Sequence, residues 1–177
     1  MTTPHDTFIT NLLYRTAQAA IGPSALRKQG ASGVISAARE AAAKIDVRKL
    51  SECNVQTFPA FLNEATDALL NRFPDKAKNW GAARKAINLY FRDLVYNADL
   101  SMYFQLKPVR ELLEVPLDKD VATGLLDQPE GKSLPKWTSI KGLQPKTSAA
   151  YQAVAAKVAS RHQVCRVDLD VFFWRAR

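Results

Sequence analysis

The most restrictive feature of the sequence is one long helical pattern between Lys78 and Asn97. Apolar residues recur in it at the three- and four-residue spacings of a single helix face. They are Trp80, Ala83, Ile87, Phe91, Leu94 and Val95. A stripe of this length has to be buried, so the rest of the chain must supply elements that pack around a central amphipathic helix.

The other segments predict further helices and almost no strand. Prolines and glycines interrupt 127–145, so that segment is expected to be mostly loop, and 51–57 is also expected to be loop. A short strand is expected only at 165–167. Helices are expected over 8–20, 33–45, 59–72, 100–106, 109–113, 118–126 and 147–161, with a last one from 168 to the chain end.

This pattern predicts an all-α fold, a compact arrangement of about eight helices in two closely packed lobes. The chain is expected to form one domain over 1–177. One lobe is expected to combine 1–75 with 147–177, and the other to contain 76–146.

Composition narrows the class of protein. Hydrophobic residues make up 47% of 177 residues, which is enough for a packed core. The longest apolar runs, such as 171–174, are far shorter than the roughly 20 residues of a membrane span, and 1–9 lacks the pattern of a signal peptide. The two cysteines, Cys53 and Cys165, fit no metal spacing and no disulfide scaffold. We expect a cytoplasmic monomer with no metal, no cofactor and no membrane partner.

The charge balance favours a polyanionic partner. Lysine and arginine number 25 against 17 acidic residues, which gives a net charge of +8 and an isoelectric point near 9.6. Such a value is typical of nucleic-acid-binding domains and predicts salt-dependent association. A solvated basic surface or an acidic protein partner would give the same composition, so charge alone leaves these alternatives open.

Three segments, 80–88, 115–122 and 167–174, contain residue types that can take part in catalysis or binding, and they follow one another in a defined order. In the middle one, an extended Val-Pro-Leu leads into Asp118 at the start of a helix. Lys85 precedes Asp118 by 33 residues, and Asp170 is followed four residues later by Trp174.

In this order and spacing, the segments resemble the helix–hairpin–helix DNA glycosylase superfamily, and in particular its archaeal 8-oxoguanine DNA glycosylase branch. The long separation of Lys85 from Asp118 and the Asp170–Trp174 pair are similar to that branch, and Gln29 matches its base-pocket glutamine. The resemblance covers about 80–174. The glycine-rich hairpin of ordinary members is not visible before Lys85, and a second pocket aromatic has only Trp80 and Trp137 as candidates.

The resemblance implies an enzyme that flips a damaged or modified base out of DNA and removes it. Lys85 would attack the sugar carbon and form a Schiff base, and Asp118 would stabilise positive charge on the sugar and shuttle the proton. An amine attacks only when unprotonated, which burial or a nearby cation such as Arg84 favours. Trp174 would stack on the base, while Asp170 and Gln29 would hydrogen-bond its edge.

The substrate stays open at this point. An 8-oxoguanine-like base is favoured by the resemblance alone, and a modified base of a foreign genome fits equally, with or without a lyase step.

Each of these residues also has a purely structural explanation. Asp118 suits a helix N-cap, Trp174 suits a core, and Lys76 and Lys78 are rival nucleophiles. The main alternative is a non-catalytic nucleic-acid-binding domain, in which Lys85 would point to solvent away from Asp118. A helical module for an acidic protein partner is the other alternative. A nuclease is disfavoured because no carboxylates have a two-metal spacing.

Overall fold

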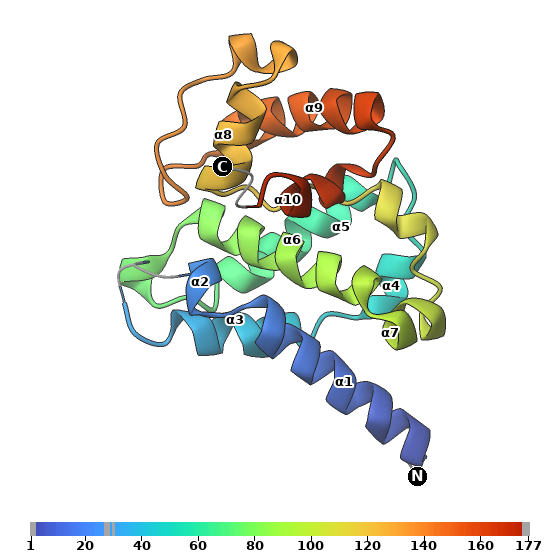
Figure 1. Cartoon of the computed structure of the whole chain (residues 1–177). Helices are drawn as coiled ribbons and strands as arrows, with labels where there is room; N and C mark the ends of the chain where they lie inside the picture. The colour runs from blue at the N-terminus through green and yellow to red at the C-terminus, as the bar shows by residue number, and fades with distance from the viewer. Residues whose placement is uncertain (1–2, 27–28, 30, 175–177) are drawn as a thin grey trace.

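The computed structural model describes residues 3–26, 29 and 31–174. Within these ranges it is entirely helical, so the predicted all-α class is confirmed (Figure 1). The α-helices are α1 (Pro4–Ala20), α2 (Pro23–Leu26), α3 (Val34–Ala42), α4 (Val47–Ser51), α5 (Phe58–Leu70), α6 (Trp80–Tyr96), α7 (Ala98–Tyr103), α8 (Lys119–Leu126), α9 (Pro145–His162) and α10 (Leu169–Phe172). Short 3₁₀ turns are η1 (Asp75–Ala77), η2 (Pro108–Glu111), η3 (Pro129–Ser133) and η4 (Arg166–Asp168).

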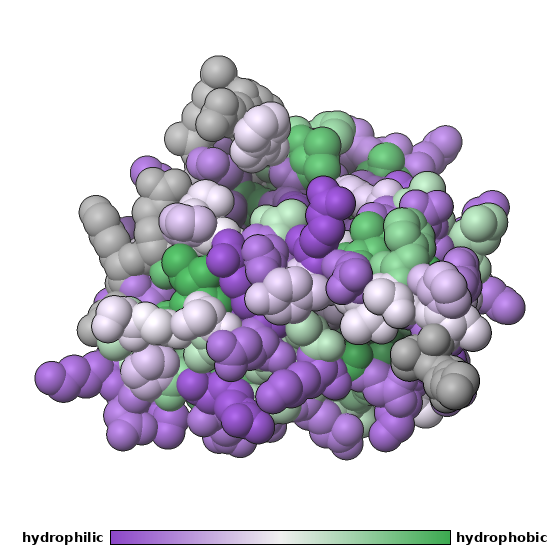
Figure 2. All heavy atoms as spheres, turned by 90° about the horizontal axis from the view of Figure 1, so that it is seen from below, coloured by the Kyte–Doolittle hydropathy of each residue, from purple (hydrophilic) through white to green (hydrophobic). Residues whose placement is uncertain are grey.

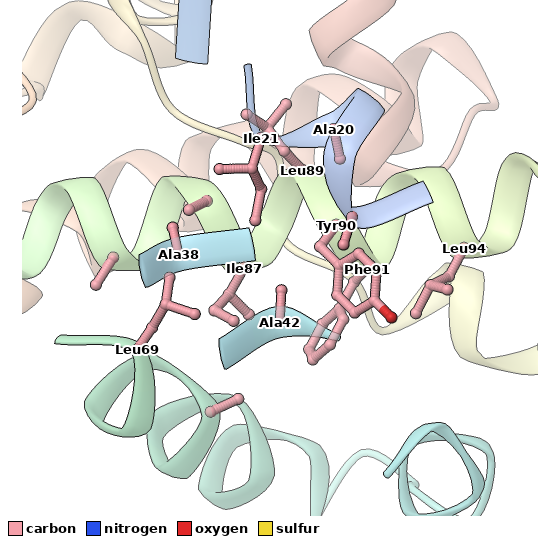
Figure 3. Close-up of a cluster of buried hydrophobic side chains, with 14 of the residues drawn as sticks. Ala20, Ile21, Ala38, Ala42, Leu69, Ile87, Leu89, Tyr90, Phe91 and Leu94 are labelled. Atoms are coloured by element: carbon pink, nitrogen blue, oxygen red, sulfur yellow. The ribbon is translucent and has the colours of Figure 1, made fainter. Parts of the chain in front are cut away.

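Helix α6 is the central element, as its apolar stripe predicts. Asn79 caps it by accepting a hydrogen bond from the Ala82 amide at 2.9 Å. Helices α1, α3 and α5 pack against it and bury it on nearly every side. Figure 3 shows Ile87 of α6 among Ala38 and Ala42 of α3 and Leu69 of α5. Helix α6 is therefore the element around which α1, α2, α3, α5 and α7 are packed.

The core contains two apolar clusters. The first joins α1 to α7 with Val167. The second joins α8, α9, α10 and the loop before α9. In the second cluster, α9 and Phe173 pack on α8, whereas Val167 belongs to the first cluster.

The last part of the chain is also corrected by the structure. The expected strand at 165–167 is wrong: a 3₁₀ turn forms there, because the Asp168 carboxylate accepts the Cys165 amide at 3.0 Å. No strand partner exists among the described residues, and the Arg166 guanidinium instead donates to the carbonyls of Leu112 and Leu113. The following helix is short, and 175–177, which it was expected to include, lie outside the described residues.

The surface is largely polar. The face of the molecule seen in Figure 2 is covered mainly by hydrophilic side chains, with small separated apolar patches. Among the described residues, no helix combines the length and the apolar character that crossing a membrane requires.

Two buried tyrosines give opposite predictions for the same substitution. The Tyr90 hydroxyl, visible in Figure 3, has no hydrogen-bond partner among the described residues. The Tyr151 hydroxyl donates to the Pro135 carbonyl at 2.7 Å. Because an unpaired buried hydroxyl costs about 1–3 kcal/mol, Tyr90→Phe is expected to raise the free energy of unfolding by about 1 kcal/mol. The matched Tyr151→Phe variant is expected to lower it by a similar amount. Urea denaturation measures both, and a Tyr90→Phe variant that is clearly less stable would contradict the burial argument.

Candidate functional site

Asp118 is fixed in place by its backbone and by a helix start. The preceding extended segment is held by Gln152 of α9, whose buried amide accepts the Val115 N–H at 3.1 Å and donates to the Val115 carbonyl at 2.8 Å. One Asp118 carboxylate oxygen, Oδ1, then accepts the amides of Asp120 and Val121 at 2.9 and 3.0 Å. The N-terminal end of α8 therefore stabilises a negative charge on Asp118.

The other Asp118 oxygen faces Lys85. The distance from Lys85 Nζ to Asp118 Oδ2 is 3.2 Å, and the two side chains are 7% and 29% exposed. Lys85 is thus buried on α6, where α8 supplies its carboxylate. An ammonium group this deep in a protein is expensive without a partner, so the contact stabilises both the fold and the position of the amine.

A second ion pair lies two turns further along the same face of α6. The Arg92 guanidinium contacts the Asp170 carboxylate of α10 and also Asp93, the latter at 2.7 Å. Residues seven apart on a helix share a face, so Arg92 follows Lys85 along one wall. Lys85 and Arg92, together with the carboxylates they contact, form a compact polar cluster between α6, α8 and α10.

This cluster opens into a pocket of about 490 Å³. Its polar wall carries both ion pairs, and its opposite wall is made of small side chains from α1 and α2. The lining residues are Ala19, Ala20, Ser24, Ala25, Lys85, Leu89, Arg92, Asp93, Tyr96, Asp118, Asp170, Val171 and Trp174. Pockets of about 300–1,000 Å³ with a few convergent polar groups are typical of small-molecule and base-sized ligands.

Burial sets the protonation behaviour of Asp170. The pKa of its carboxyl is raised above the ordinary 3.8, mainly because burial disfavours the charged form, and the nearby negative charge of Asp118 adds to this. Arg92 and Lys85 act in the opposite direction without overcoming it. A carboxyl in this state is suited to exchange a proton with a bound polar ligand.

The C-terminal segment that carries Asp170 and Trp174 is docked by two contacts. A Cβ atom added at Gly124 of α8 would lie 2.3 Å from the Phe173 ring, so only glycine allows this ring to pack there. Asp168 accepts hydrogen bonds from the Tyr96 hydroxyl at 2.7 Å and from Arg110 Nη2 at 2.9 Å. Burial, followed by this bond to Asp168, raises the pKa of Tyr96. These contacts hold α10 over the pocket.

The sequence-predicted residues separate into two groups. Lys85, Asp118, Asp170 and Trp174 all line the pocket, with the Trp174 side chain 63% exposed at this site. Gln29 is buried at the start of α6, where its side-chain oxygen accepts a hydrogen bond from Asn79 Nδ2 at 3.1 Å. It does not belong to the pocket lining.

The rival residues lie elsewhere. Lys78 pairs with the exposed Asp75 at 2.8 Å, outside the pocket. Trp137 packs edge-on against Tyr151 in the second core cluster. Trp80 lies beneath the Arg84 guanidinium, at 5.3 Å from ring centroid to Cζ.

Arg84 itself belongs to a structural network rather than to the pocket. Its guanidinium donates to both Glu114 oxygens at 2.9 Å and to Asn63 and Thr66. Glu114 neutralises the charge of Arg84, so the expectation that Arg84 would act on the Lys85 amine gains no support from this geometry.

Arg92, Tyr96 and the small residues of α1 and α2 were not predicted. For Arg92 the sequence held a signal, since it lies two helical turns after Lys85. For Ala19, Ala20, Ser24 and Ala25 it held none, because only the packing of α1 on α6 brings them to the pocket.

Comparisons with protein-family models, curated proteins and solved structures find no match to this chain. The site is therefore interpreted from its own geometry. Among the described residues, no group of three or more histidine, cysteine, aspartate or glutamate side chains is arranged to hold a metal ion.

The raised pKa of Asp170 predicts how stability varies with pH. The folded state binds a proton at pH values where unfolded Asp170, with its ordinary pKa of 3.8, has already lost it. The contribution of Asp170 to stability therefore falls as pH rises from 3.8 through the folded pKa. Urea unfolding of wild type and Asp170→Asn over this range is expected to show the stability difference, wild type minus variant, decreasing with pH. A difference that increases with pH would show instead that the Arg92 pairing outweighs burial.

The contact between Gly124 and Phe173 can be tested by adding one methyl group. Gly124→Ala is expected to push Phe173 out of its position and lower the free energy of unfolding by about 1–3 kcal/mol. Gly22→Ala is the control, because the nearest atom to an added Cβ there is 3.9 Å away. The control is expected to stay within about 0.5 kcal/mol of wild type in the same urea denaturation. Equal stability of the two variants would contradict the packing argument.

Proposed function

We propose that this protein is a DNA glycosylase that uses Lys85 as its nucleophile. The observation that carries the proposal is the Lys85–Asp118 contact at 3.2 Å inside a pocket that Asp170 and Trp174 also line. Residues separated by 33 and 85 positions in the sequence converge on one cavity. That convergence supports the resemblance to the helix–hairpin–helix glycosylases, which was based on order and spacing alone.

The chemistry requires an unprotonated amine and a carboxylate. Unprotonated Lys85 Nζ would attack C1′ of the deoxyribose while Asp118 is ionised. The C1′–N bond would break with its electron pair going to the base, and Asp118 would relay to the departing base the proton that the new secondary ammonium group loses. Ring opening of the resulting aminal gives a Schiff base between Lys85 and the sugar. During this step Asp118, held by the α8 amides, would stabilise the positive charge that develops on the sugar.

The rest of the pocket suits an extruded base. Trp174 lines the pocket, and its stacking on the base would contribute about 1–3 kcal/mol. Asp170 and Arg92 offer an acceptor and donors for the polar edge of a base, while Leu89 and the alanines of α1 and α2 supply an apolar wall. The proposed substrate is a damaged or modified base, with an 8-oxoguanine-like purine favoured by the resemblance. We place the protein in the cytoplasm and treat it as a monomer.

A non-catalytic nucleic-acid-binding domain is the alternative. In that case Lys85 is expected to point to solvent, away from Asp118. Its burial against Asp118 favours the catalytic proposal. A solvent-facing lysine would also bind phosphate more readily than one already paired with a carboxylate.

Borohydride trapping tests the proposal directly. Purified wild type is mixed with labelled oligonucleotides that contain 8-oxoguanine, uracil or an abasic site, and sodium borohydride reduces any Schiff base to a stable adduct. Lys85→Gln keeps a polar side chain beside Asp118, and Lys78→Gln is the matched control at an exposed lysine. Adduct formation is expected with wild type and Lys78→Gln, with a loss of at least about 100-fold in Lys85→Gln.

The outcomes separate clearly when folding is checked by circular dichroism. An adduct that persists in a folded Lys85→Gln variant would show that another lysine is the nucleophile. Base release without an adduct would support a glycosylase without a Schiff base. Neither adduct nor base release from a wide panel of modified bases would overturn the glycosylase proposal.

A further inference from the structure

The positive charge of the chain is concentrated in one segment. Residues 131–167 contain five lysines and two arginines and no aspartate or glutamate. Their combined charge of +7 accounts for nearly all of the net charge of +8. The rest of the chain is therefore almost neutral, and any polyanion is attracted mainly to this segment.

The two arginines of the segment are already occupied, whereas its lysines are exposed. Arg161 pairs with Glu130 at 2.9 Å, and Arg166 is bonded to the backbone carbonyls near η2. Among the described residues, no lysine of the segment forms an ion pair of 4.0 Å or less. These lysines are Lys132, Lys136, Lys141, Lys146 and Lys157, all exposed to solvent.

Apolar anchors fix the loop that presents the lysines. Lys136 lies between Pro135, whose carbonyl accepts the buried Tyr151 hydroxyl, and Trp137, which packs on the Tyr151 ring. Lys141 lies two residues before Leu143, which is buried in the second core cluster. Lys136 and Lys141 are exposed on a loop that these contacts anchor to the core. Less entropy is lost on binding by a loop that is already ordered.

The same loop touches α6 next to the pocket. A Cβ atom at Gly81 would lie 2.1 Å from the Ile140 carbonyl oxygen, so the loop packs directly on the first turn of α6. Lys85 follows Gly81 by four residues, which is about one helical turn. In Figure 1 the loop and the start of α9 form one side of the molecule, next to α8 and the N-terminal end of α6.

We propose that Lys136, Lys141 and Lys146 form the surface that binds the phosphate backbone of duplex DNA. This lysine surface lies beside the pocket and would hold the strand while one nucleotide enters it. Its proposed partner is a series of phosphates, because separate exposed lysines on the loop and at the start of α9 suit repeated single charges. The inference deepens the proposed glycosylase function by assigning the DNA-binding surface, and it rests on that proposal only for the identity of the nucleotide in the pocket.

The test compares two triple variants with the same change in charge. One replaces Lys136, Lys141 and Lys146 with glutamine. The control replaces Lys44, Lys49 and Lys107, which are exposed on other elements. Binding of each purified full-length protein to a short, undamaged, labelled DNA duplex is followed by fluorescence anisotropy over a range of salt concentrations.

Each phosphate contact contributes about 0.9 to the slope of log affinity against log salt concentration. The lysine-surface variant is expected to lose up to about 2.7 from this slope and at least about tenfold in affinity at low salt. The control variant is expected to keep the wild-type slope. Equal losses in both variants, or a larger loss in the control, would overturn the proposal.

A second arm separates DNA from an anionic membrane. Vesicles of phosphatidylcholine with phosphatidylserine are added to the same proteins. The DNA assignment would be overturned by two results together. Wild type would sediment with these vesicles, and the lysine-surface substitutions would leave the salt slope for DNA unchanged. Absence of DNA binding by wild type would overturn it as well.

The DNA-binding experiment and the borohydride test can each contradict one proposal without contradicting the other. Loss of DNA binding in the lysine-surface variant without any trapped adduct would support the surface and count against the glycosylase. A trapped adduct, together with DNA binding that the lysine-surface substitutions leave unchanged, would support the glycosylase and overturn the proposed DNA-binding surface.

Discussion

The structure depends on the burial of α6 together with the polar groups that it carries. A helix surrounded on nearly every side has no solvated face for its charged residues, and an unpaired buried charge costs far more than a paired one. Four buried or half-buried side chains of α6 meet partners from the second half of the chain. The pairs are Arg84 with Glu114, Lys85 with Asp118, Asn88 with Glu114, and Arg92 with Asp170. These contacts connect the cluster of α8, α9 and α10 to the helical core.

Of the four pairs, those formed by Glu114 have a structural role, and those of Lys85 and Arg92 belong to the candidate site. The Arg84–Glu114 pair is closed by Asn63 and Thr66, so it is fully satisfied and has no free approach for a ligand. The Lys85 and Arg92 pairs open instead into the pocket. There burial raises the pKa of the Asp170 carboxyl above its ordinary value. The same requirement, to neutralise charges on a buried helix, thus supplies both a structural network and the polar wall of the pocket.

The position of the short helix α10 depends on contacts with distant parts of the chain. A segment from Leu169 to Phe172 is too short to be stable as an isolated helix. It is held by the Phe173 ring against Gly124, by the hydrogen bonds of Asp168 and by the Arg92–Asp170 pair. Each contact comes from a residue distant in the sequence. The placement of Trp174 at the pocket therefore depends on tertiary packing.

The sequence by itself determined the all-α class, the central helix, the N-cap at Asp118 and the set of Lys85, Asp118, Asp170 and Trp174. These follow from local rules, namely helical periodicity, capping chemistry and an ordered resemblance. Only the tertiary structure decided that Lys85 is buried against Asp118, that Arg92 joins the pocket, and that Gln29 bonds to Asn79 instead. It also replaced the expected strand at 165–167 with a turn and set the cluster boundaries. The physical reason is that burial and ion pairing between distant segments depend on how helices pack, which no local pattern records.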